Sequence, residues 1–149
     1  MIPIQQTKRV VILPPQFKNN GAFAGNTYFD ALGWGHAEVL FIVGETNVIV
    51  GSGDTSTPPF IEECDESGGS YTPVTDAELS AVIGAGDDYK NFAIDIDLTK
   101  THKRYMQVNA PTAGNVTGAN LCIEVTLSNP SGQGPRDAAE RGLEEIVYA

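Results

Sequence analysis

Two segments of the chain alternate strictly between hydrophobic and polar or small residues. In residues 92–98 the even-numbered positions are hydrophobic, and in residues 121–127 the odd-numbered positions are hydrophobic. Because successive side chains of a strand point to opposite faces, both segments predict strands with one buried and one solvent-facing side. Strands of this kind are typical of antiparallel sandwiches and barrels, whereas fully covered parallel sheets contain continuous hydrophobic runs.

Further strands are predicted where short hydrophobic runs end at turn residues. The turn sequences are Gly33-Trp34-Gly35, Gly44-Glu45-Thr46 and Gly51-Ser52-Gly53-Asp54. The additional strands are expected at residues 10–13, 27–32, 37–43, 47–50, 60–64 and 104–109. About eight short strands result, and they predict an all-β antiparallel sandwich or jelly-roll-like domain.

One or two short helices are expected on this scaffold. Residues 76–83 could form one, with Asp76 as its cap and Gly84 as its stop. Residues 136–141 could form another, with Pro135 at the first helical position and Gly142 just past the end. Short helices would leave the all-β class unchanged.

The chain is expected to divide near residue 129. Residues 1–129 form the predicted sandwich body, and residues 130–149 form a linker, a short helix and a C-terminal arm. The linker sequence 129–135 is rich in Pro and Gly. The arm contains Leu143, Ile146 and Tyr148, so it needs a docking site on its own body or on another subunit.

Length and charge limit the classes of function. The chain has 149 residues, the usual size of one domain, and 16 Gly and 9 Pro interrupt it. Nine basic against nineteen acidic residues give a net charge of -10, which argues against nucleic acid as a partner. No hydrophobic stretch approaches the roughly 20 residues of a membrane-spanning helix, and no export signal is recognisable at the N-terminus. Cys64 and Cys122 are therefore expected as reduced thiols.

Candidate catalytic residues are few. Asp95 and Asp97 share one face of a predicted strand, and we interpret them as its solvent-facing side. The histidines are His36 and His102, and no serine lies in a Gly-x-Ser-x-Gly turn. The Gly-rich segment 51–56 lacks a phosphate-binding lysine. We predict no enzymatic activity, no metal and no cofactor.

A compact group of basic residues is the strongest candidate contact in the body. Lys100, Lys103 and Arg104 lie in one predicted turn between two strands, and a protein contact or simple solvation explains them better than nucleic acid does. Trp34 stands between two glycines, either as an anchor at the edge of the core or as an interface residue, since Trp is enriched at binding hot spots.

The order of several segments resembles a known family. These segments are 29–39 running into 44–47, then 95–98 leading into 103–105, and finally 138–143. Over roughly residues 27–147 the chain resembles the capsid decoration, or cement, proteins of tailed bacteriophages. None of the matching segments is a catalytic motif.

The resemblance implies a structural protein of the virion. Such a protein would be made in the host cytoplasm, bind the outer capsid surface, bridge neighbouring capsomers and stabilise the shell. The implied partners are the major capsid protein and further copies of the chain, as a trimer or dimer, with strand edges available for pairing. The expected contact residues are Trp34, Lys100, Lys103, Arg104, Arg136, Arg141, Leu143, Ile146 and Tyr148.

Two other functions stay open from the residues. A carbohydrate- or host-surface-binding sandwich would use exposed aromatic side chains such as Trp34, Tyr71 and Tyr89 around a shallow site. A weaker alternative is an enzyme that uses Asp95 and Asp97.

Overall fold

The computed structural model describes residues 6–25, 27–51, 56–131 and 138–144. Within these ranges the regular elements are strands. They are β1 (Lys8–Lys18), β2 (Gly21–Ala22), β3 (Phe29–Asp30), β4 (Trp34–Gly51), β5 (Phe60–Cys64), β6 (Thr72–Glu78), β7 (Asn91–Asp97), β8 (Tyr105–Val108) and β9 (Pro111–Pro130).

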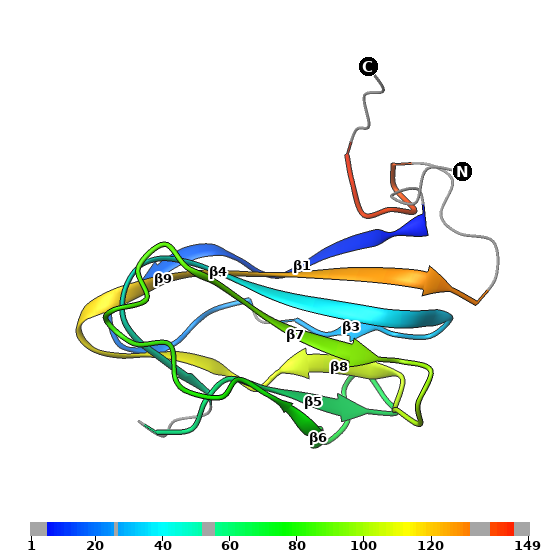
Figure 1. Cartoon of the computed structure of the whole chain (residues 1–149), viewed down its shortest axis with the longest axis horizontal. Helices are drawn as coiled ribbons and strands as arrows, with labels where there is room; N and C mark the ends of the chain where they lie inside the picture. The colour runs from blue at the N-terminus through cyan, green and yellow to red at the C-terminus, as the bar shows by residue number, and fades with distance from the viewer. Residues whose placement is uncertain (1–5, 26, 52–55, 132–137, 145–149) are drawn as a thin grey trace.

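The strands form two layers (Figure 1). One sheet has the order β1-β9-β4-β7, with β2 also paired to β9, and the other has the order β3-β8-β5-β6. Every pairing is antiparallel. Setting aside the short β2, the first strand pairs with the last, the second with the second last, and so on inwards to β5 and β6. This wrapped ribbon is the jelly-roll arrangement, so the all-β sandwich prediction is confirmed.

The core lies between the two sheets and is filled by the alternating strands. On β7, Ile94 and Ile96 are 6% and 3% exposed, while Asp95 and Asp97 face solvent. On β9, the odd-numbered residues from Leu121 to Leu127 are at most 2% exposed. Both alternating segments therefore form strands with the predicted buried face.

Strand limits agree with the sequence prediction in part. The strand expected at residues 60–64 is confirmed as β5. The strands expected at 37–43 and 47–50 form one element, β4, because β9 pairs with both halves and Gly44-Glu45-Thr46 is a bulge between them. The bulge is held by side chains, since Asn120 Nδ2 donates to the Glu45 carbonyl and Asp88 Oδ1 accepts from the Thr46 amide, at 3.0 and 2.8 Å.

The helix expected at residues 76–83 is wrong. Asp76 belongs to β6 and has φ of 61°, and Ala77 and Leu79 are both buried at the spacing of a strand. The backbone of this segment bonds to other strands: the Leu79 amide donates to the Pro59 carbonyl, and Ile83 pairs with Ile49. Neighbouring strands supply the partners that a helix would find within itself.

The helix expected at residues 136–141 is also wrong over residues 138–141, the part of it that the structure describes. Residues 138–143 form hydrogen-bonded turns, in which the Leu143 amide donates to the Ala138 carbonyl at 2.8 Å. Gly142, predicted as the stop, has φ of 72°. These turns lie against the start of β1, where the Arg9 amide donates to the Arg141 carbonyl at 2.8 Å.

Candidate functional site

A hollow of about 310 Å³ lies at the end of the sandwich where β4 begins. Most of its lining comes from two connections that are far apart in the sequence, β3–β4 and β7–β8, and Asp65 comes from the β5–β6 connection. Its lining includes Leu32, Trp34, Asp65, His102, Lys103 and Arg104. Three of the predicted contact residues, Trp34, Lys103 and Arg104, therefore meet at one place.

The β3–β4 connection is a tight turn that presents an apolar pair. The Trp34 amide donates to the Ala31 carbonyl at 3.2 Å, and Gly33 supplies the positive φ of 85° that such a turn requires at its third position. Leu32 at the tip is 65% exposed, whereas Trp34 is partly buried and packs against the core. The Ser131 amide also donates to the Gly33 carbonyl at 2.8 Å. The turn is thus fixed on both sides.

Arg104 forms the polar wall of the hollow. Its Nε and Nη2 donate to the two carboxylate oxygens of Asp30 at 3.0 and 2.6 Å, a bidentate arrangement. The hydrogen bond from Arg104 holds the pKa of Asp30 below its ordinary value. The guanidinium also lies over the Tyr105 ring, 4.9 Å from its centroid, and Tyr28 meets that ring edge to face at 5.3 Å.

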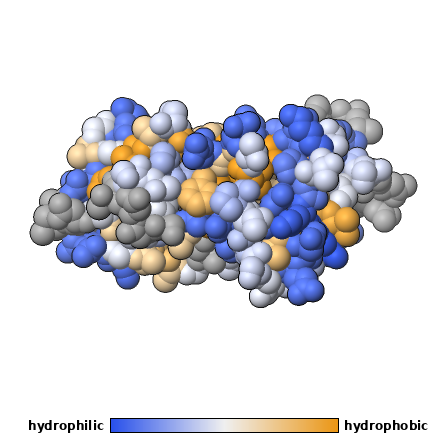
Figure 2. Space-filling model, turned by 90° about the horizontal axis from the view of Figure 1, so that it is seen from below, coloured by the Kyte–Doolittle hydropathy of each residue, from blue (hydrophilic) through white to orange (hydrophobic). Residues whose placement is uncertain are grey.

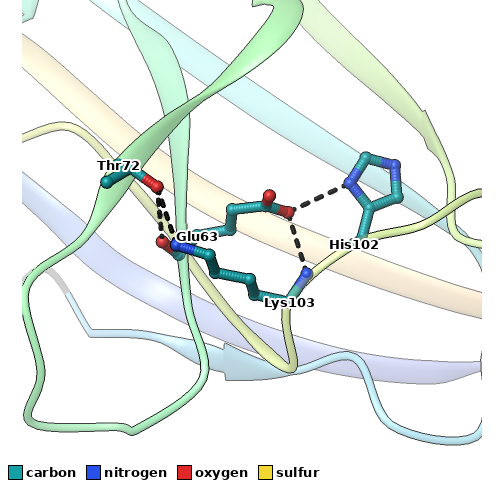
Figure 3. Close-up of polar contacts among 4 residues, drawn as sticks. All are labelled: Glu63, Thr72, His102 and Lys103. Atoms are coloured by element: carbon teal, nitrogen blue, oxygen red, sulfur yellow. Dashed lines mark hydrogen bonds and ion pairs between the residues drawn. The ribbon is translucent and has the colours of Figure 1, made fainter.

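Glu63 fixes the neighbouring backbone (Figure 3). Its Oε2 accepts from the Lys103 amide at 3.1 Å and lies 3.0 Å from His102 Nδ1. The side chains of Glu63 and His102 are each only 16% exposed. Lys103 Nζ reaches across to Thr72 Oγ1 at 3.1 Å. Residues from β5, β6 and the β7–β8 connection are therefore joined in one network beside the hollow.

The basic residues of the β7–β8 connection differ in their partners. Arg104 is paired with Asp30, while Lys100 lies 3.9 Å from Asp97 and its side chain is 75% exposed. Asp97 is itself held by Thr99, whose hydroxyl and amide hydrogen bonds lower the pKa of the Asp97 carboxyl. Carboxylates thus offset much of the positive charge that the sequence concentrates here.

The predicted C-terminal contacts lie elsewhere or outside the described residues. Arg141 is only 6% exposed, beside β1, and Leu143 is partly buried in the same turn. Neither residue lines the hollow. Arg136, Ile146 and Tyr148 lie outside the described residues.

Of the residues named for the alternative functions, Trp34 lines the hollow, whereas Tyr71, Tyr89, Asp95 and Asp97 do not. Tyr89 is 77% exposed, and its amide donates to the Gly44 carbonyl, which β4 separates from Trp34 by roughly 30 Å at about 3.3 Å per residue. Tyr71 donates its hydroxyl to the Ser67 carbonyl, and burial raises its pKa. Asp95 lies 3.2 Å from His36 Nε2 on the outer face of the sheet.

A second hollow, of about 510 Å³, opens on the outer face of the five-stranded sheet. Phe17 and Ile42, which line it, are 57% and 39% exposed. Cys122 also lines it, and burial raises the pKa of this thiol. Both Cys122 and Cys64 are free thiols.

Sequence reasoning missed Leu32, Asp30 and Glu63 as parts of the site. The exposure of Leu32 could have been predicted from the sequence, since a residue directly before a turn glycine lies at the tip of the turn. The roles of Asp30 and Glu63 could not have been predicted, because each contacts its partner only after distant strands pair.

Comparisons of the chain with protein-family models, with curated proteins and with solved structures found no match. In the described part of the chain, His, Cys, Asp and Glu do not form a group of three or more that could hold a metal ion. The same residues contain no helix long and apolar enough to cross a membrane.

Proposed function

We propose that the chain is a structural protein of a bacteriophage virion, which binds the outer capsid surface and stabilises the shell by bridging capsomers. The hollow beside Trp34 is its contact with the major capsid protein. The observation that carries this proposal is the meeting of Leu32, Trp34 and Arg104 at one end of the sandwich. Trp and Arg are two of the residue types that are enriched at binding hot spots.

The rigidity of this end supports a docking role. The Ala31–Trp34 turn, the Asp30–Arg104 pair and the Glu63 network hold the side chains before any partner arrives. A surface that is already ordered loses little conformational entropy on binding. The exposed part of Leu32 can therefore contribute apolar burial at small cost.

The remaining surface fits a protein that resists non-specific aggregation before it docks. Figure 2 shows the side of the molecule seen from below in Figure 1, where hydrophobic residues appear in separate groups among hydrophilic ones. With a net charge of -10, copies repel one another at long range, and this opposes non-specific aggregation. Many weak contacts on one shell would then add up through multivalency.

Binding to capsids tests the proposal directly. Capsids of the parent phage assembled without this protein are mixed with the purified chain and sedimented. We expect saturable co-sedimentation, and we expect Trp34→Ala to weaken it by at least tenfold, as for a hot-spot residue that contributes about 1.4 kcal/mol or more. Tyr89→Ala is the matched control, since this exposed aromatic residue is far from the hollow and its loss should leave binding unchanged.

The same assay distinguishes the carbohydrate alternative. If the chain fails to bind these capsids but is retained on a glycan array, with retention lost in Trp34→Ala, the capsid proposal is wrong and the carbohydrate-binding function takes its place.

A further inference from the structure

In the described part of the chain, the outer strands β1, β3 and β6 carry features that block pairing with another chain. β1 contains Pro14 and Pro15, has two register shifts, and gives its Arg9 amide to the Arg141 turn. β3 has two residues. β6 contains Pro73, a register shift against β5 and the positive φ of Asp76. Such edges are poor templates for an added strand.

β7 has none of these features. It is seven residues long, contains no proline, and pairs with β4 in unbroken register from Asn91 to Asp97. In the two-sheet arrangement of Figure 1 it is the last strand of its sheet. In the described part of the chain no other strand pairs with its outer edge.

The alternation of hydrogen bonds between β7 and β4 shows which backbone groups point toward the outer edge of β7. At one end of β7 the Val43 amide donates to the Lys90 carbonyl, and at the other the Leu98 amide donates to the Gly35 carbonyl. In an antiparallel pair alternate residues bond to the same neighbour, so the even-numbered residues from 90 to 98 bond to β4. The N–H and C=O groups of Asn91, Ala93 and Asp95 therefore point outward, unpaired among the described residues.

The outward backbone groups of Asn91, Ala93 and Asp95 are equally spaced, so they can pair with the same groups of a second copy of the chain. An antiparallel second β7 with its two-fold axis at Ala93 sets Asn91 opposite Asp95 and Ala93 opposite Ala93. Each of these pairs exchanges two N–H···O=C bonds. A register shifted toward Asp97 would use a carbonyl that already accepts from the Lys100 amide at 3.3 Å.

The side chains fit the same register on both faces. On the outer face each Asp95 lies opposite an Asn91, so no two carboxylates oppose each other directly. On the inner face each Phe92 lies opposite an Ile94, and Phe92 is only partly buried against the core of its own chain. An aromatic side chain beside a β-branched one is a favourable cross-strand pair.

We propose that β7 is a self-association edge, which pairs antiparallel with β7 of a second copy and joins two five-stranded sheets into one continuous sheet. The partner strand is β7 of a second copy, because the backbone groups, charges and apolar side chains of two β7 strands match in one two-fold register. This inference does not rest on capsid binding and is tested without capsids.

Sedimentation velocity over a concentration series, followed by native mass spectrometry, tests the pairing. We expect the wild-type chain to pass from monomer to dimer as concentration rises, and more readily at high salt because its net charge of -10 is then screened. Ala93→Glu places two carboxylates opposite each other beside Asp95, and we expect loss of the dimer. Mixing it with Ala93→Lys should restore a dimer that contains one copy of each variant.

Ala85→Glu is the control, because it makes the same exposed substitution off the edge and should dimerise like the wild type. A wild-type chain that stays monomeric into the millimolar range, an Ala93→Glu variant that dimerises normally, or a mixture that forms no heterodimer overturns the proposal. A monomeric result leaves the capsid assay to decide the proposed function by itself.

Discussion

β1 and β7 are outer strands on opposite sides of the same sheet, and their free edges differ. The edge of β1 is interrupted by prolines and bulges, its Arg9 amide is covered by the Arg141 turn, and its Ile12 carbonyl accepts from the Thr27 amide. The edge of β7 is regular, and among the described residues no further strand pairs with it. The difference indicates that protection against strand pairing is local, because within one sheet one edge carries it and the other does not.

The sharpest way to probe the β7 edge is to place proline at two adjacent positions. Ile94→Pro removes an N–H that bonds to β4 together with a buried side chain, and we expect a loss of more than about 3 kcal/mol in the free energy of unfolding. Ala93→Pro removes an outward N–H, so we expect the monomer to stay folded while self-association disappears. Thermal denaturation and sedimentation measure the two effects.

If both prolines unfold the chain equally, the assignment of inward and outward amides is wrong. If Ala93→Pro still dimerises, β7 does not pair through Ala93.

We expect a smaller loss of stability from a substitution in the 138–143 turn, which lies against β1. Gly142 has φ of 72°, and a Cβ there would collide with the Arg9 carbonyl oxygen. Gly142→Ala should therefore destabilise the docked turn by about 1–3 kcal/mol. Hydrogen exchange at the Arg9 amide should speed up, with little change at β7.

Gly68→Ala is the matched control, since its Cβ would meet no atom within 4 Å and its φ is not positive. Unchanged protection of the Arg9 amide in Gly142→Ala would show that the turn does not depend on this contact.

The smallest effect is expected at β3, the shortest outer strand. Arg104 lowers the pKa of Asp30 in the folded chain below its ordinary value of 3.8, so the folded state binds fewer protons than the unfolded state in this range. The stabilisation is present above about pH 4 and is lost as pH falls through the folded pKa. Asp30→Asn should flatten this acid-side decline in melting temperature, while an unchanged decline would assign it to other carboxyl groups.

The sequence predicted what depends on alternation and missed what depends on pairing. Ile94, Ile96 and the odd-numbered residues of 121–127 are buried as predicted, because their two-residue period has one physical interpretation. The segment from Asp76 to Ile83 was misinterpreted because its backbone partners, Pro59 directly before β5 and Ile49 of β4, come from distant parts of the chain. Local signals for a helix cap cannot reveal a competing strand.

Some residues of the candidate hollow were predictable from the sequence, but their meeting at one place was not. Trp34 and Arg104 each stood out in the sequence, yet they meet only because β3 pairs with β8. The ion pair between Asp30 and Arg104 likewise joins residues that the chain separates widely. Leu32 gained its role from the turn geometry at Gly33, which exposes it.

The pairing of β1 with β9 also has a consequence for how the protein is made. Lys8 lies opposite Leu127, so the first strand finds its neighbour only after nearly the whole body has been synthesised. Contacts of such long sequence separation slow folding, to on the order of milliseconds to seconds for all-β domains. Until β9 has been made, β1 has no β9 to pair with, and it contains Pro14 and Pro15, a residue type that disfavours strand pairing.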